Sequence, residues 1–239
     1  MTRIYAWLIF GLSTAFAVAP ALTSPFSGFE ADQLPNPQMN PPVQPAGYAF
    51  AIWGLIYAWL IISASYGVWK RRDDPVWNAA RPALAISLAI GVPWLAIANA
   101  SAIWATITIW LMALFAIIAL VRAPVADRWL FQAPVGIYAG WLTAASFVSL
   151  GSTAAGYNIL TDQYYWAIIC IIGALAVATF VYTKRPSAPE YLFTVIWALV
   201  GIIVANGMAQ PIISALAAGG IVALLLTMLR WRGKGAVGA

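Results

Sequence analysis

Long uninterrupted runs of hydrophobic residues dominate this chain, and short polar connectors separate them. Most runs approach the roughly 20 residues that an α-helix needs to cross the hydrocarbon core of a bilayer. Their hydrophobicity is continuous and lacks the alternation of a membrane β-barrel strand, which favours helices. The pattern predicts eight membrane-spanning helices, over residues 4–22, 47–69, 83–100, 102–121, 129–150, 164–182, 191–206 and 211–229.

The composition agrees with a membrane environment. Of the 239 residues, 63% are hydrophobic and 8% are charged, whereas a soluble domain carries roughly 25% charged residues. The connectors are too short to fold independently, so residues 1–239 are treated as a single membrane domain. We therefore expect an all-α protein, a polytopic membrane helix bundle whose main partner is the lipid bilayer.

The positions of the basic residues predict the orientation of the bundle. If eight helices cross the membrane, all twelve Lys and Arg residues fall on one side, and the other side holds only three charged residues. Short cytoplasmic loops are enriched in Lys and Arg, so both termini are expected in the cytoplasm, in a bacterial plasma membrane. The net charge of +5 is then an orientation signal, and no nucleic-acid partner is expected. The cations are Arg3, Lys70, Arg71, Arg72, Arg81, Arg122, Arg128, Lys184, Arg185, Arg230, Arg232 and Lys234, and the three acidic residues opposite are Glu30, Asp32 and Asp162.

The first hydrophobic run has a second interpretation. Arg3, the apolar stretch and the small residues Ala17 to Ala19 together resemble a secretory signal peptide, whose cleavage would leave seven helices. We favour a retained helix, because Pro20 directly follows the best cleavage site and the run is long enough to span the bilayer. The connector that follows, residues 23–46, contains six prolines and is expected to be semi-rigid. It either covers the mouth of the bundle or serves as a plain linker.

Chemically active side chains are scarce in the predicted spans. None contains Asp, Glu, Lys, Arg or His, which disfavours a proton-coupled pump and excludes retinal bound through a lysine Schiff base. The chain has no histidine for haem ligation, and its one cysteine, Cys170, has no partner for a disulfide or a metal cluster. No catalytic constellation is visible, so we expect a protein that is not an enzyme.

Aromatic residues recur at helical spacing in two spans. Phe50, Trp53 and Tyr57 follow one another at intervals of three and four residues, and so do Pro134, Tyr138 and Trp141. Two facing stripes of this kind could sandwich a flat apolar ligand. For an arbitrary membrane helix, helix packing or lipid contact is the better explanation of such stripes.

Glycine and proline add two structural expectations. Gly136 and Gly140 form a small-xxx-small step that allows another helix to approach closely, either within the monomer or across a homodimer interface. Pro93 and Pro134 are expected to kink their helices.

Several of these residues together resemble a known family. The run from Pro45 to Tyr57 reads Pro-Ala-Gly-Tyr-Ala-Phe-Ala-Ile-Trp-Gly-Leu-Ile-Tyr, and it is similar to the second-helix signature of the tryptophan-rich sensory protein family (TspO/MBR, the translocator protein family). Residues 109–111, around Trp110, and residues 134–141 resemble the family's fourth and fifth helices. The resemblance covers helices one to five, over residues 1–152, and residues 153–239 add three helices. One departure is that only two residues separate Phe50 from Trp53, where the family usually has three, which rotates one side chain by about 100° relative to the other on an α-helix.

The resemblance implies an aromatic-lined pocket, capped by the first loop, that binds a tetrapyrrole such as a porphyrin, or a sterol-like molecule. The family's ligand-binding aromatic residues correspond to Trp53, Tyr57 and Tyr138, with Trp141 nearby. With the rest of the two stripes and Trp110, the expected ligand-binding residues are Phe50, Trp53, Tyr57, Trp110, Pro134, Tyr138 and Trp141.

Three functions are consistent with the sequence. The leading hypothesis is an integral membrane binding or sensory protein with a pocket for a planar hydrophobic ligand. A transporter or permease for an uncharged or amphipathic solute is an alternative, as is a subunit that assembles into a larger membrane complex.

Overall fold

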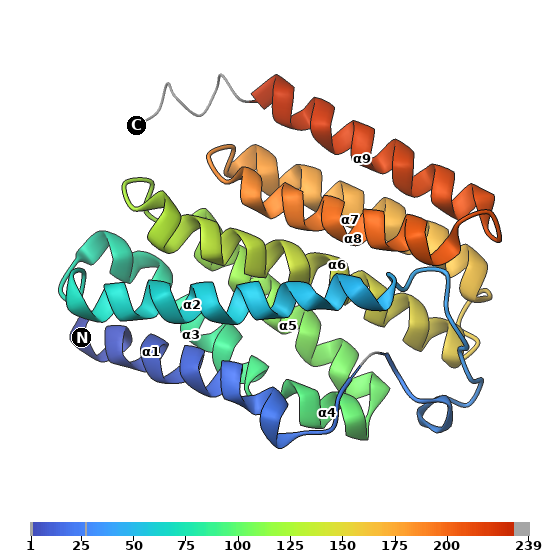
Figure 1. Ribbon diagram of the computed structural model, residues 1–239, viewed down its shortest axis with the longest axis horizontal. Coiled ribbons are helices and arrows are strands. Elements are labelled where there is room, and N and C mark those ends of the chain that lie inside the picture. The colour runs from blue at the N-terminus through green and yellow to red at the C-terminus, as the bar shows by residue number, and fades with distance from the viewer. Residues whose placement is uncertain (1, 27, 232–239) are drawn as a thin grey trace.

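The protein is a bundle of long helices, shown by a computed structural model that describes residues 2–26 and 28–231 (Figure 1). Within these residues, eight segments are long and apolar enough to cross a membrane. The all-α membrane bundle predicted from the sequence is thus confirmed. The helices are α1 (Thr2–Val18), α2 (Ile52–Trp69), α3 (Pro75–Gly91), α4 (Trp94–Ala100), α5 (Ala102–Val121), α6 (Ala133–Gly156), α7 (Gln163–Lys184), α8 (Pro189–Asn206) and α9 (Pro211–Trp231). Short 3₁₀ turns, η1 (Ala19–Leu22), η2 (Ala31–Gln33) and η3 (Gly47–Ala51), and one π-helical turn, η4 (Arg128–Gln132), join them.

Helix α6 lies at the centre of the bundle and packs against α5, α7 and α8 (Figure 1). The described basic residues gather at one end of the bundle, on the left in Figure 1, which we call the basic end. The connector of residues 23–46 lies at the opposite end, on the right, which we call the loop end. Arg232 and Lys234, two of the predicted cations of the basic end, lie outside the described residues.

Several helices begin at side chains that cap their free backbone N–H groups. The Asp74 carboxylate accepts hydrogen bonds from the backbone N–H groups of Val76 (2.8 Å) and Trp77 (3.4 Å), and Pro75 takes the first position of α3. Asp162 caps α7 and Ser101 caps α5 in the same way. With the Asp74 cap, α3 begins at Pro75, eight residues before the start at residue 83 that the hydrophobic run predicts.

The longer helices correct one expectation, that no ionisable side chain lies inside a span. Arg81 lies within α3 and is 1% exposed, and Glu190 lies in the first turn of α8 and is 6% exposed. Both are near the basic end and both are partnered. Arg81 donates to the carbonyl oxygens of Gly67 (3.2 Å) and Arg71 (2.9 Å) at the end of α2, and Glu190 is ion-paired with Arg128. Burial of a charge is tolerated here because each group has a hydrogen-bonded partner.

A polar cluster at the basic end joins α2, α3 and the connector before α6. The Asp127 carboxylate accepts hydrogen bonds from the Arg71 guanidinium (2.8 Å) and from the buried Trp77 indole N–H (2.7 Å). The hydrogen bond from the Arg71 guanidinium holds the pKa of Asp127 below its usual value, so the carboxylate remains ionised at neutral pH. This cluster fixes the basic ends of α2 and α3 relative to the connector before α6.

The two predicted proline kinks have different outcomes. Helix α3 ends at Gly91 and α4 begins at Trp94, so the predicted span is broken at Pro93. Pro134 lies in the first turn of α6, where the π-helical turn η4 passes directly into the α-helix, and Arg128–Gly156 form one continuous helical segment. The kink at Pro134 stays a prediction.

Gly136 and Gly140 are used for packing within the chain. A Cβ atom on Gly140 would lie 2.3 Å from the Tyr191 carbonyl oxygen, and one on Gly136 would lie 3.5 Å from the Tyr191 nitrogen. Helix α8 packs over both glycines. Of the two predicted roles, close packing within the monomer and a homodimer interface, the structure therefore shows the first. A homodimer stays a prediction, but these two glycines are not free to form its interface.

Candidate functional site

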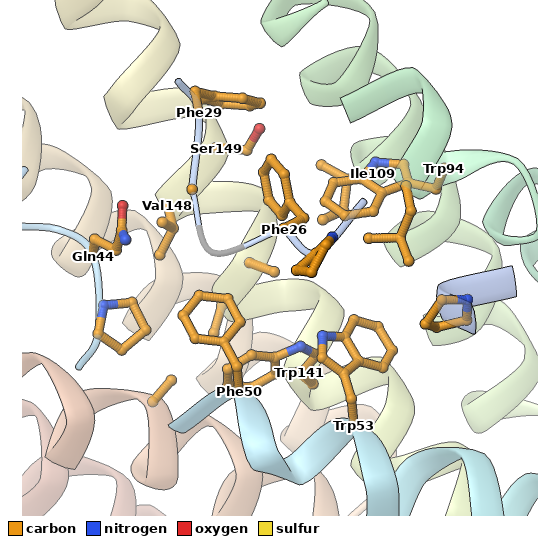
Figure 2. Close-up of a pocket in the computed structure, with 18 of the residues that line it drawn as sticks. Phe26, Phe29, Gln44, Phe50, Trp53, Trp94, Ile109, Trp141, Val148 and Ser149 are labelled. Atoms are coloured by element: carbon orange, nitrogen blue, oxygen red, sulfur yellow. The ribbon is translucent and has the colours of Figure 1, made fainter. Parts of the chain in front are cut away.

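A cavity of about 270 Å³ lies at the loop end of the bundle, lined by α1, α2, α4, α5, α6, α8 and the connector of residues 23–46 (Figure 2). Most of its lining is apolar or aromatic. Phe50, Trp53 and Trp141 lie on one side in Figure 2, and Phe26 lies across the cavity from them. The aromatic side chains that line it are Phe16, Phe26, Phe29, Phe50, Trp53, Tyr57, Trp94 and Trp141.

Phe16 of α1 is the centre of the aromatic cluster on the α2 side. Its ring makes edge-to-face contacts with Trp53 (5.7 Å between centroids), Tyr57 (5.1 Å) and Tyr138 (5.8 Å). Trp53 and Tyr57, one helical turn apart, are stacked at 5.3 Å. Such contacts favour fixed ring orientations, so this side of the cavity is preorganised.

The backbone before α2 brings Phe50 onto the same side as Trp53. Phe50 belongs to the 3₁₀ turn η3, and α2 begins only at Ile52. In a 3₁₀ turn, residues three apart lie on the same face, whereas in an α-helix they diverge by about 60°. The short Phe50–Trp53 spacing is thus compatible with both side chains facing the cavity.

Trp141 of α6 lines the cavity and carries an unpaired hydrogen-bond donor. Its ring contacts Phe50 (5.7 Å) and Trp53 (6.2 Å) edge to face, and the residue is 2% exposed. Its buried indole N–H has no hydrogen-bond partner among the described residues. By contrast, the indole N–H groups of Trp94 and Trp197 donate to the carbonyl oxygens of Ala105 (3.1 Å) and Ala49 (3.0 Å). A buried donor without an acceptor is uncommon and suggests a missing partner.

Tyr138 lies behind the cavity wall and does not line it. The residue is fully buried, and its hydroxyl is hydrogen-bonded to Ser87 (2.9 Å), which donates to the Met112 carbonyl oxygen (2.8 Å). Its ring supports Phe16 from behind. Tyr138 therefore positions a wall residue.

The seven predicted site residues separate into three groups. Phe50, Trp53, Tyr57 and Trp141 line the cavity, and Tyr138 supports it. The structure does not bring Trp110 or Pro134 to it. Ile109 faces the cavity, and successive residues of an α-helix point about 100° apart, so Trp110 is turned away from the cavity. It packs on Phe147 instead, with 4.9 Å between the ring centroids. Pro134 is about 10 Å along α6 from Trp141, toward the basic end.

Several cavity residues were missed from the sequence. Phe16 and Trp94 belong to no stripe, and only the three-dimensional packing brings them together with α2. Phe26 and Phe29 lie in the connector, for which the sequence left open a cover or a plain linker. Their place in the cavity lining shows that the connector is a cover.

Four hydrogen bonds to three helices hold this cover. Gln33 donates to the Ala98 carbonyl oxygen (2.8 Å), and Asn36 donates to that of Gly156 (3.1 Å). In the other direction, Asn99 donates to the Ser24 carbonyl oxygen (3.1 Å) and Asn206 to that of Pro42 (2.8 Å). The connector is thus fastened to α4, α6 and α8.

Helix α8 also contributes to the cavity. Ala198 lines it, and the Trp197 indole N–H donates to the Ala49 carbonyl oxygen in the turn that carries Phe50. The Ala46 backbone N–H donates to the Gly201 carbonyl oxygen (3.0 Å), and a Cβ atom on Gly201 would lie 2.7 Å from the Pro45 Cβ. The position of Phe50 therefore depends on close packing against α8.

Comparison with known proteins gives one match. The model of the family described as TSPO-like protein matches residues 4–230. This match runs through all eight spans and so extends beyond residues 1–152, which resemble the five-helix family members. No curated protein and no solved structure matches the chain.

Proposed function

Because this chain belongs to the TSPO-like family, we propose that it is an integral membrane binding or sensory protein whose cavity at the loop end holds a planar hydrophobic ligand. The observation that carries this proposal is the unpaired Trp141 N–H in an aromatic wall. Flat rings on two sides offer stacking surfaces, and the buried donor offers one point of orientation.

The size of the cavity bears on the ligand. Ligand pockets usually measure about 300–1,000 Å³, so 270 Å³ is at the lower limit. A sterol-like or tetrapyrrole ring therefore requires the cover to move outward. We expect the cover to hinge at Gly28, because its φ of +140° is a conformation that glycine adopts readily and other residues rarely adopt.

Ligand binding is tested by titrating the purified protein with a porphyrin, both as the free acid and as the dimethyl ester, and following tryptophan emission. At least one form should quench the emission saturably. Trp141→Phe removes the N–H and keeps an aromatic ring, so it should raise the Kd about tenfold, the equivalent of one lost hydrogen bond.

Trp110→Phe is the matched control, since it makes the same change outside the cavity. Its Kd should equal that of the wild type. If both substitutions changed the Kd equally, or if neither porphyrin quenched saturably, a planar ligand in this cavity would be contradicted.

We also propose that the basic end faces the cytoplasm of a bacterial cell and that the cover faces outward. The excess of Lys and Arg at one end supports this orientation. Single cysteines introduced at Lys70 and Lys184 into a Cys170→Ala background should both be shielded from an impermeant thiol reagent in intact cells, and one at Asn40 should react. Reaction of either basic-end position would contradict the orientation.

A further inference from the structure

The cavity is far from every cation of the chain. None of the described residues that line it is charged. The sequence has no Lys or Arg between residues 4 and 69, 82 and 121, or 129 and 183, which include the cavity-lining parts of α1, α2, α4, α5 and α6. A ligand carboxylate inside the cavity would therefore lose its hydration without gaining an ion pair, which is costly in an apolar environment.

The mouth of the cavity is unfavourable for anions as well. Glu30 directly follows the cavity residue Phe29, and Asp32 lies two residues further on. Both side chains are exposed, and the remaining charged residue at the loop end, Asp162, is also acidic. The negative charges of these three residues repel an approaching anion. If the carboxylates of a bound ligand stayed at the mouth, they would lie near Glu30 and Asp32 and be repelled as well.

The unpaired indole N–H of Trp141 still requires a hydrogen-bond acceptor. An indole N–H can only donate, and that of Trp141 is buried beside the ring of Trp53. A ketone, ester or ether oxygen, or a ring nitrogen, satisfies such a donor without bringing a charge. A carboxylate would also accept the hydrogen bond, but a neutral donor does not supply the opposite charge that a buried anion needs.

We propose that this cavity selects an uncharged planar molecule that carries a hydrogen-bond acceptor, and discriminates against the same ring bearing carboxylates. The inference rests on the proposed ligand-binding function and adds the charge class of the ligand.

A matched pair of probes tests it, protoporphyrin IX and its dimethyl ester, which share one ring and differ in charge. In a nonionic detergent at pH 7.5, the ester should bind at least tenfold more tightly than the acid. The Kd of the acid should fall as the pH is lowered toward the carboxyl pKa of about 4–5, because protonation removes the charge, and that of the ester should stay constant.

The outcomes separate the inference from the proposed function. An acid that binds as tightly as the ester, or more tightly, overturns the charge preference and leaves the ligand-binding function standing. If neither porphyrin binds saturably, the ligand-binding function itself is contradicted.

A charge reversal at the mouth gives a second test that keeps the cavity wall intact. Glu30→Lys should lower the Kd of the acid several-fold, in a manner that salt screens, and should leave the Kd of the ester unchanged. Asp73→Lys makes the same change in charge at the basic end, where Asp73 is exposed beside Arg3, and should alter neither Kd. An acid affinity that responds equally to both substitutions, or to neither, would contradict an effect of charge at the mouth.

Discussion

Replacing Gly140 with alanine is expected to destabilise the protein by about 3 kcal/mol, at the upper end of what overpacking usually costs. The added methyl group would lie 2.3 Å from the Tyr191 carbonyl oxygen and 3.0 Å from the Thr194 Cβ. Neither is the end of a flexible side chain, so α6 and α8 would have to separate. The separation would also strain the hydrogen bond between Thr143 and Tyr191 (2.9 Å).

The measurement is the midpoint of thermal unfolding in detergent, followed by circular dichroism. Gly219→Ala in α9 is the matched control, because a Cβ atom there would meet no atom within 4 Å. Alanine is the better helix former by about 1 kcal/mol, so the control should be neutral or slightly stabilised. Equal midpoints for the two variants would show that α6 and α8 do not pack at Gly140 as described.

Gly201→Ala is expected to raise the Kd of the porphyrin ester at least tenfold. The new Cβ atom would lie 2.7 Å from the Pro45 Cβ and 3.1 Å from the Ala49 Cβ, both close to the backbone. The turn η3 must then move away from α8, and Phe50 moves with it, away from Trp141. Stability should fall less than for Gly140→Ala, because the turn is near the protein surface and the α6–α8 contact is central.

Tryptophan quenching by the ester measures this effect, and Gly219→Ala again serves as the control. A folded Gly201→Ala protein with the wild-type Kd would show that α8 does not determine the position of Phe50.

The result also bears on the last three helices. Residues 153–239 were expected to add three helices to a five-helix part, yet the cavity takes Ala198 from them and depends on their packing. If the Kd rises, α8 is part of the binding site.

Much of the fold could be predicted from local sequence. Each run of about 20 apolar residues can satisfy its backbone hydrogen bonds in a membrane only as a helix, so the eight spans follow from hydrophobicity alone. The stripe of Trp53 and Tyr57 follows from helical periodicity, since residues four apart share a face. The helix starts were less predictable, because the polar caps Asp74 and Asp162 extend α3 and α7 beyond their apolar runs.

By itself, then, the sequence determined which segments are helices, that the basic residues gather at one end of the bundle, and which aromatic side chains share a helix face. Only the tertiary structure decided which faces meet. It brought Phe16, Trp94 and Phe26 to Trp53, turned Trp110 toward Phe147, and left the Trp141 N–H without an acceptor. The physical reason is that helix periodicity acts within a few residues, whereas a cavity is defined by contacts between residues far apart in the chain, which no local pattern records.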